Sequence, residues 1–499
     1  MSTSISFKRL VGRGAAWTTL DVVIGRLGSF ITGIVVARIL APEAFGVFAV
    51  ALVVHAVVVN VSELGVSAAL IRDDRDTAVR SAPTVATISL VNSALLAVLM
   101  AGLSPVLARV LGSPAAAGPI AIMALMLPLA GITAVPAAFL RRDFRMDRIF
   151  LANIANLAVT TVVVISLAVA GWGPMALAWS WVLSQAVSSA VLLTYRPGRF
   201  WPGWDGAEAR RLLRFGLPLA GANLLVFSVL NVDYLIIGHV LGAEMVGLYM
   251  LAFNISGWPM NVFGSVIRSV SLPGFSKLRL DGASMPTQFT KAIRGVAALT
   301  LPICFILGAL AQPAIDAVYG SDWSAAAAAL IGLSVLGGAR ILLELCGDYL
   351  VALGRTRAIL VAQVPWLISL TVGLLLVVPM HGIGGAGAVQ AVVAIGIMAP
   401  VYLWFLSRSG VHAPAVIRAV ALPAAWALFA AVIAHVVADR FENNFVACAV
   451  GGAAGLLVAA APYLPQILRI ARSARPRRRK ESSVVTTTDQ QVAVGGVVE

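Results

Sequence analysis

The sequence predicts an all-α integral membrane protein with about fourteen transmembrane helices, each of about 20 apolar residues. Apolar residues make up 60% of the 499 positions, and the mean hydropathy is +0.94. This composition excludes an ordinary soluble protein. The lysines and arginines fall in alternate gaps between the apolar stretches. Because basic loops are retained in the cytoplasm, this alternation predicts an even number of crossings and places both termini on the cytoplasmic side.

The charge pattern can be read gap by gap. The gaps expected in the cytoplasm hold Lys8, Arg9 and Arg13; Arg72, Arg75 and Arg80; Arg141, Arg142, Arg145 and Arg148; the basic residues of 196–214 and 268–294; Arg355 and Arg357; Arg408 and Arg418; and those of the C-terminal tail. The opposite gaps hold only Arg38, Arg109 and Arg440. Loop orientation therefore accounts for the net charge of +14, and we expect no nucleic-acid partner.

The apolar stretches give the expected helices in order. They occupy residues 14–37, 43–64, 81–104, 117–140, 149–170, 174–195, 213–239, 244–266, 292–312, 324–347, 357–380, 384–406, 415–437 and 444–466. A basic interruption around Pro197, Pro202 and Gly203 divides them. We therefore expect an N-terminal six-helix lobe (1–200), a C-terminal six-helix lobe (201–410), a final helix pair (411–468) and a basic disordered tail (469–499).

The two lobes contain a repeated segment. Residues 39–48 (ILAPEAFGVF) align with residues 240–249 (VLGAEMVGLY) at a constant offset of 201 positions. Both copies fall at the turn between the first two helices of their lobe. A six-helix unit keeps its membrane orientation when it is repeated, so the lobes are predicted to be parallel repeats about an axis along the membrane normal. Such a pair encloses a central cavity and alternates between inward-open and outward-open states.

The sequence argues against an enzyme. The outward loops are short and carry no acid/base cluster, and the inward loops carry no glycine-rich lysine loop for a nucleotide phosphate. Cys304, Cys346 and Cys448 lie inside apolar spans without paired spacing and are expected to be free core residues. We therefore expect no catalytic residues, no metal and no cofactor, which leaves a membrane potential or a proton or sodium gradient to supply energy.

Helix 14–37 carries two charges that are costly inside a bilayer and therefore point to function. Asp21 and Arg26 are five residues apart, about 140° around the helix, so they face different partners. Arg26 lies near the expected midplane, where an interhelical ion pair and a substrate contact are both open. Gly25, Ser29 and Gly33, spaced by four, are expected to pack closely against another helix.

Other intramembrane charges lie in later helices. Arg340, Glu344 and Asp348 recur at spacing four and share one face, which is expected to point to a cavity or to other helices. Lone His55 and His239 are expected to form structural hydrogen bonds. The central-cavity candidates for substrate binding are Arg26, Arg340 and Asn231, and the candidates for ion coupling or gating are Asp21, Asp233, Glu63, Glu344 and Asp348.

Several segments together resemble a known family. They are residues 37–48, 63–67 (ELGVS), 136–145 (PAAFLRRDFR), 233–238 (DYLIIG), 272–278 (LPGFSKL) and 319–323 (YGSDW). Over roughly residues 10–360 the chain resembles the polysaccharide transport proteins, the Wzx-type oligosaccharide flippases of the multidrug/oligosaccharidyl-lipid/polysaccharide exporter superfamily.

The resemblance implies a flippase in the bacterial cytoplasmic membrane. It implies two six-helix lobes around a V-shaped cavity, and a cargo of oligosaccharide on polyprenyl diphosphate, moved from the inner to the outer leaflet for exopolysaccharide or O-antigen-type synthesis. It also implies that Arg26 contacts the diphosphate, with membrane lipids and polysaccharide polymerase or assembly proteins as candidate partners. Two relatives of this superfamily remain alternatives: a peptidoglycan-precursor flippase, which has fourteen helices but more cavity cations, and a cation-coupled drug exporter, which usually has twelve.

Overall fold

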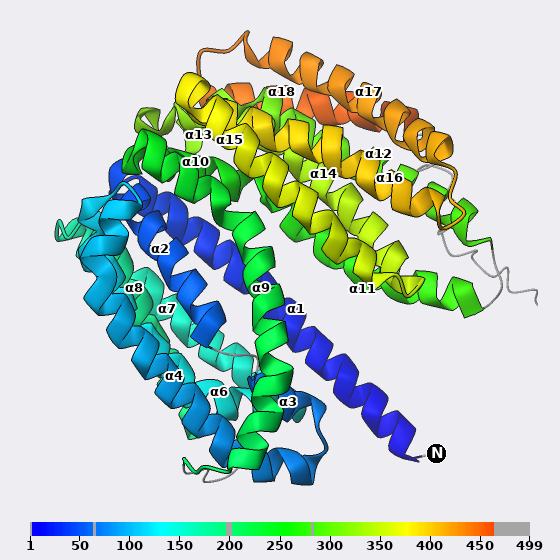
Figure 1. Ribbon diagram of the computed structural model, residues 1–499. Helices are drawn as coiled ribbons and strands as arrows, with labels where there is room; N and C mark the ends of the chain where they lie inside the picture. Colours follow the sequence, from blue (N-terminus) through cyan, green and yellow to red (C-terminus); the bar gives the residue numbers. More distant parts are fainter. Residues whose placement is uncertain (1, 63–65, 196–201, 281–283, 464–499) are drawn as a thin grey trace, which may run out of the picture.

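The structure is a computed structural model that describes residues 2–62, 66–195, 202–280 and 284–463 (Figure 1). In these ranges all regular secondary structure is helical. The first part of the chain forms α1 (Ser2–Ala37), α2 (Pro42–Ser62), α3 (Val66–Arg72), α4 (Arg75–Val110), η1 (Pro114–Ala116), α5 (Ala117–Met123), α6 (Met126–Arg142), α7 (Met146–Val169) and α8 (Pro174–Thr194). Glu63 and the tail 469–499, both named by the sequence analysis, lie outside the described residues.

The second part continues with more helices. These are α9 (Gly206–Leu241), α10 (Ala243–Ser256), α11 (Trp258–Leu280), α12 (Met285–Ala309), α13 (Ala311–Val318), η2 (Ser321–Trp323), α14 (Ala326–Ala352), α15 (Thr356–Val393), the π-helical turn η3 (Ala394–Met398), α16 (Ala399–Ser407), α17 (Ala413–Ala438), α18 (Asn444–Ala460) and η4 (Ala461–Tyr463). Among the described residues, ten helical segments are long and apolar enough to cross a membrane.

Helix bounds differ from the expectation at several places, and three of them change how the expected helices are divided or joined. The expected helix 117–140 is divided into α5 and α6, and the expected helix 244–266 is divided at Gly257 between α10 and α11. In the opposite sense, the expected helix 357–380 and the first part of the expected helix 384–406 both lie in α15, and the second expected helix continues through η3 and α16. The join contains Gly382 with φ 59° and ψ −150°, a backbone conformation that glycine adopts because it has no Cβ. The interruption therefore falls at the turn expected for residues 381–383.

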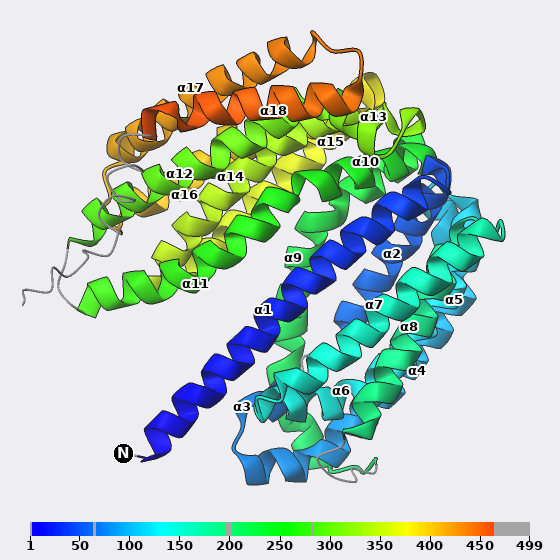
Figure 2. The same ribbon diagram turned by 180° about the vertical axis from the view of Figure 1, so that it is seen from behind.

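The helices form two groups that meet at one end and diverge toward the other (Figures 1 and 2). Helices α2 to α8 form the first group, and α10 to α18 form the second. Each group has its own buried cores, since α2, α4, α5, α7 and α8 share one cluster and α10, α14 and α15 share another. Helix α1 runs diagonally between the groups, with its N-terminal end at the open side.

Helix α9 belongs to both groups. Leu212, near its start, is buried in a core with α3, α4 and α6, whereas Ile237, near its end, is buried with α10, α14 and α15. Figure 1 shows α9 crossing from the open end of the first group to α10. The helix therefore connects the two groups mechanically as well as in sequence.

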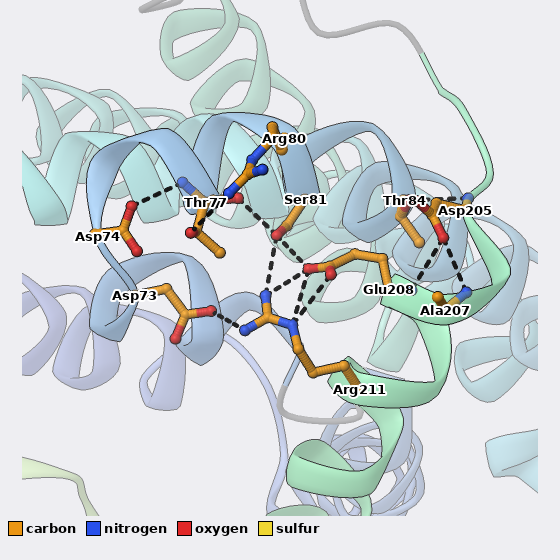
Figure 3. A network of polar contacts seen from close by, with 10 residues as sticks. All are labelled: Asp73, Asp74, Thr77, Arg80, Ser81, Thr84, Asp205, Ala207, Glu208 and Arg211. Atoms are coloured by element: carbon orange, nitrogen blue, oxygen red, sulfur yellow. Dashed lines mark hydrogen bonds and ion pairs between the residues drawn. The ribbon is translucent and has the colours of Figure 1, made fainter.

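A polar network fixes the start of α9 to α3 and α4 (Figure 3). The Arg211 guanidinium forms an ion pair with Asp73 at 2.7 Å and a second with Glu208, and it also donates to the Ser81 hydroxyl at 3.2 Å. Asp205 caps the helix by accepting from the backbone N–H of residues 207 and 208 at 2.9 and 3.1 Å. Hydrogen bonds from Arg211 hold the pKa of Glu208 below its ordinary value.

The two groups meet where α2 crosses α10. The Arg38 side chain, just after α1, donates from Nε to the carbonyl oxygen of Val318 at 2.9 Å and from Nη2 to that of Ala317. The Trp323 indole N–H donates to the carbonyl oxygen of Ala37 at 2.9 Å, and the Trp323 ring packs edge-to-face with Phe45 at 5.0 Å. These contacts join the end of α1 and the start of α2 to α13 and η2.

Candidate functional site

A cavity of about 640 Å³ lies between α1, α7 and α8. It is lined by residues of these helices together with Phe45, Met126 and Met250. Asp21 and Arg26, the two charged candidates of α1, both line it. A volume of this size falls within the range of small-molecule binding sites. The cavity is therefore the candidate site that the structure offers for the first group of helices.

Arg26 and Asp21 have different surroundings. The Asp21 carboxylate accepts a hydrogen bond from Asn153 Nδ2 at 2.8 Å, which joins α1 to α7. Arg26 is exposed to the cavity and makes no hydrogen bond or ion pair with any residue that the structure describes. An interhelical ion pair, one of the two roles left open for Arg26, is thus not formed among the described residues. The guanidinium is available to a ligand.

The glycine stripe of α1 does not pack against another helix, which corrects the sequence expectation. Gly25, Ser29 and Gly33 line the cavity, and a Cβ placed on either glycine would meet nothing within 4 Å. Close packing occurs instead at Gly28, where a Cβ would lie 2.5 Å from Leu157 of α7. The stripe therefore leaves open space beside Arg26, because glycine has no side chain to fill it.

The remaining polar lining is uncharged. It consists of hydroxyl and amide side chains: Ser29, Thr32, Asn153, Asn156, Thr160, Ser180, Ser184 and Gln185. Trp181 contributes an aromatic ring, held edge-to-face against Phe48 at 5.5 Å. Since Asp21 and Arg26 are the only charged residues of the lining, its formal charge is zero when both are ionised. Such a surface suits a polar ligand whose anionic part meets Arg26.

Asp233 lies in the second group, away from this cavity. Its side chain is fully buried and accepts hydrogen bonds from the Tyr249 hydroxyl at 2.8 Å and from Gln390 Nε2 at 3.0 Å. The three residues come from α9, α10 and α15. A buried carboxylate is costly unless it is hydrogen-bonded or neutralised, and the bonds from Tyr249 and Gln390 offset part of this cost.

Three other second-group candidates, Arg340, Glu344 and Asp348, lie on α14. The Arg340 guanidinium lies 6.0 Å from the Phe253 ring centroid and within electrostatic reach of Asp233 and Glu344. Asp348 accepts a hydrogen bond from the Ser271 hydroxyl on α11. Neither Arg340 nor Asn231 lines the cavity that contains Arg26. The structure thus divides the predicted site residues between the two groups of helices.

Some important residues were not predicted from the sequence. Asn153, Asn156 and Gln185 line the cavity, and Tyr249 and Gln390 bind Asp233. For the four amides the sequence signal is a polar side chain inside an apolar span, whereas the predictions rest on intramembrane charge; Tyr249 carries no such signal.

The two histidines have different outcomes. His239 Nδ1 lies 3.3 Å from the carbonyl oxygen of Val110, which confirms the expected structural hydrogen bond. His55 is buried, and its Nδ1 has no hydrogen-bond partner in the described part of the chain, so the same expectation is wrong for that nitrogen. Cys304, Cys346 and Cys448 are free, as expected.

Bacterial proteins named for polysaccharide transport or biosynthesis match a large part of the chain. It is 28% identical over 326 residues to the succinoglycan biosynthesis transport protein ExoT of Rhizobium meliloti, covering 63% of this chain and 64% of that protein. The alignment thus spans slightly less than two thirds of that relative. It is 25% identical over 352 residues to the lipopolysaccharide biosynthesis protein WzxC of Escherichia coli, covering 68% and 70%. The teichuronic acid biosynthesis protein TuaB of Bacillus subtilis is 25% identical over 301 residues, covering 59% and 61%.

Solved structures share the fold. The lipid II flippase MurJ in an inward closed conformation matches with a TM-score of 0.74 over 91% of this chain and 99% of that one, at 13% identity. An inward-facing multidrug resistance MATE family transporter of the MOP superfamily matches with a TM-score of 0.60 over 80% and 99%, at 17% identity. At these identities the likeness shows the fold alone.

A family model described as "Polysaccharide biosynthesis protein" matches residues 35–328, more than half of the chain. The match includes the repeated segment, the α2–α10 crossing and Trp323. Together with the apolar helices and the bacterial relatives, it identifies a multi-pass protein of the bacterial cytoplasmic membrane. The chain belongs to the polysaccharide biosynthesis protein family, as the resemblance predicted.

Proposed function

We propose that this protein is a transporter, not an enzyme, that moves oligosaccharide linked to polyprenyl diphosphate from the inner to the outer leaflet. The observation that carries the proposal is Arg26, an exposed guanidinium without a partner among the described residues, in the wall of a cavity of about 640 Å³. The names of three relatives, for succinoglycan transport and for lipopolysaccharide and teichuronic acid biosynthesis, support this cargo.

The chemistry of Arg26 fits a diphosphate. A guanidinium binds phosphate oxygens through two parallel N–H donors and keeps its charge when it is partly desolvated. The polar headgroup needs such a cavity to avoid hydrocarbon, while the lipid tail can remain in the bilayer. The peptidoglycan-precursor and drug-export alternatives gain no specific support, because one cation and one anion line the cavity and the MurJ and MATE likenesses extend to the fold only.

The proposal includes an orientation. Fourteen crossings with both termini in the cytoplasm place the α2–α10 junction at the outer face and the diverging end at the inner face. The conformation is then inward-open, with lobes at 1–200 and 201–410 and a helix pair at 411–468. The loops around Arg38, Gly112 and Trp323, all expected to be outward, meet or approach the opposite group at this junction, which supports the assignment.

Two energy sources fit the proposed transport. An inside-negative potential favours outward movement of an anion by about 2.3 kcal/mol per charge per 100 mV. In this proposal a proton or sodium gradient acts in addition through Asp233, and Arg340 lies within electrostatic reach of both Asp233 and Glu344. Asp21 and Asp348 are assigned to gating, since each has a hydrogen-bond partner on a neighbouring helix.

The test is reconstitution of the full chain in vesicles with a fluorescent lipid-linked oligosaccharide. Transfer between leaflets is scored with and without an imposed potential. Arg26→Gln is expected to reduce transfer at least 10-fold, since the phosphate loses its charged partner. Arg109→Gln, on the exposed outer end of α4, is the matched control and should leave transfer unchanged. Equal transfer by wild type and Arg26→Gln would remove the proposal's main support.

A further inference from the structure

Amide side chains of α7 and α8 lie at the depth of Arg26 in the cavity. A hydrogen bond of 2.8 Å between the Thr32 and Thr161 hydroxyls joins α1 to α7. Arg26 lies six residues before Thr32, and Asn156 five residues before Thr161. At about 1.5 Å per residue, Arg26 and Asn156 each lie roughly 8–9 Å along their helices from the Thr32–Thr161 hydrogen bond. Gln185, 11 residues into α8, lines the same cavity.

These amides have unused hydrogen-bonding capacity. The Asn156 side chain lines the cavity, and neither its NH₂ nor its carbonyl oxygen makes a hydrogen bond with any residue that the structure describes. Gln185 donates one long hydrogen bond of 3.4 Å from its NH₂ group to the Ser189 hydroxyl on its own helix. Its carbonyl oxygen remains available to accept a hydrogen bond from a ligand. An amide both donates and accepts, as the hydroxyl and acetamido groups of a sugar do. The cavity is thus equipped for a ligand with many such groups.

The charges of the cavity define the ligand further. Arg26 is the lining's one cation, and the one anion, Asp21, is already hydrogen-bonded to Asn153. If Arg26 binds phosphate, no second cation of this lining is available to pair with another anionic group of the ligand. That group would also be repelled by the Asp21 carboxylate. Burial of an unpaired charge is unfavourable. The lining therefore favours an uncharged group beside the phosphate.

Space and an aromatic surface are available beside the amides. Gly25 and Gly33 leave their side of α1 open, and Trp181 lines the cavity on α8 one turn before Gln185. An aromatic ring offers a flat apolar face beside a polar edge, which suits the C–H face of a sugar ring.

We propose that Asn156, Gln185 and Trp181 form a subsite that recognises the neutral sugar next to the diphosphate held by Arg26. This inference rests on the proposed function and adds its substrate class: a lipid diphosphate whose first sugar is uncharged. A site built to hydrogen-bond hydroxyl and amide groups discriminates strongly against ligands that lack them, because its own polar groups are then left unpaired.

The test measures binding of three labelled probes to the purified full chain. One is farnesyl diphosphate, the second carries N-acetylglucosamine on the diphosphate, and the third carries glucuronic acid. Wild type should bind the N-acetylglucosamine probe most tightly. Asn156→Leu and Gln185→Met should each weaken that probe about 5- to 10-fold, the loss of one hydrogen bond or more, and leave bare farnesyl diphosphate unchanged. Arg26→Gln should weaken all three probes.

A matched control and the opposing outcomes complete the design. Gln288→Met makes the same change on α12, outside the cavity, and should alter no probe. The unfolding temperature of each variant checks folding, which Asn156→Leu should preserve because no described partner loses a bond. The subsite is wrong, and the proposed function stands, if Arg26→Gln weakens the binding of all three probes but the amide variants either change no affinity or weaken the binding of farnesyl diphosphate equally. The subsite is also wrong if wild type binds the glucuronic acid probe most tightly. If wild type binds no probe saturably, the proposed function itself fails.

Discussion

Gly46 of α2 and Gly247 of α10 lie against each other's helix in a reciprocal contact. A Cβ placed on Gly46 would fall 1.6 Å from the carbonyl oxygen of Ala243, and one placed on Gly247 would fall 2.0 Å from that of Pro42. Pro42 and Ala243, like the two glycines, are 201 positions apart. The repeated segments therefore meet each other around a local two-fold relationship. The absence of side chains at both positions permits this close crossing.

Substitution of these glycines should separate the two groups of helices. Gly46→Ala introduces a Cβ that overlaps backbone, which cannot move aside as a side chain can, so the crossing must open. We expect a loss of at least about 1–3 kcal/mol in unfolding free energy, the usual cost of overpacking. A fall in the unfolding temperature would show the loss of stability. Faster chemical labelling of a cysteine introduced near residue 41 would show that the crossing has opened.

Gly102→Ala provides the control for this change. Gly102 is also helical, but a Cβ there meets nothing within 4 Å. Alanine is favoured over glycine inside a helix by up to about 1 kcal/mol, so this variant should be neutral or slightly more stable. An unfolding temperature for Gly46→Ala equal to that of Gly102→Ala would show that the crossing tolerates a side chain.

The repeat shows what the sequence could predict. The matched offset and the charge alternation are chain-wide patterns, and the Gly46–Gly247 crossing agrees with the first of them. The rotation of a single helix was not predictable. Gly25 and Gly33 face open space, whereas Gly28, about 60° around the helix from Gly25, lies against Leu157 of α7. The spacing of small residues does not show which of these neighbouring positions packs against another helix.

Tertiary partners of the site were equally hidden from the sequence. Asp233 could be recognised as a charge in an apolar span, but Gln390, which binds it, is 157 positions away along the chain. Arg340 was grouped with Arg26 because both are intramembrane cations. The structure places Arg340 beside Phe253 in the other group of helices, since sequence spacing says nothing about which lobe surface a helix face meets.

The Trp323 indole should contribute to closure of the α2–α10 end. Trp323→Phe keeps an aromatic ring against Phe45 but removes the N–H that binds the Ala37 carbonyl oxygen at 2.9 Å in a buried setting. An unsatisfied buried acceptor costs about 1–3 kcal/mol, so the unfolding temperature should fall. Trp172→Phe, at a side chain that is half exposed, should have little effect. Indistinguishable melting of the two variants would argue against a stabilising role for the Trp323 hydrogen bond.

Replacement of Asp233 should separate ion coupling from folding. Asp233→Asn keeps the shape and removes the charge, and its carbonyl oxygen can still accept from both Tyr249 and Gln390, because these two donors bind the same carboxylate oxygen of Asp233. We expect a folded protein whose transfer of lipid-linked oligosaccharide no longer responds to an imposed proton or sodium gradient. Asp439→Asn, at an exposed residue beyond α17, should keep the wild-type response. A gradient response that survives in Asp233→Asn would assign coupling to another group.

The Arg211 network should stabilise the start of α9 at neutral pH and lose this effect in acid. The pKa of Glu208 is lowered in the folded protein by its hydrogen bonds from Arg211, so the associated stabilisation is complete above about pH 4.5, the ordinary value, and is lost as the pH falls through the lower folded-state pKa. Arg211→Ala should lower the unfolding free energy by up to about 1 kcal/mol, since the network is partly exposed. The difference from wild type should stay constant from pH 8 to about pH 5 and shrink in more acidic solution. Arg210→Ala, in the same turn but outside the network, should show no such pH dependence. A difference that grows as the pH falls below 4.5 would contradict the assigned role of Glu208, because protonation of that carboxylate can only weaken its ion pair with Arg211.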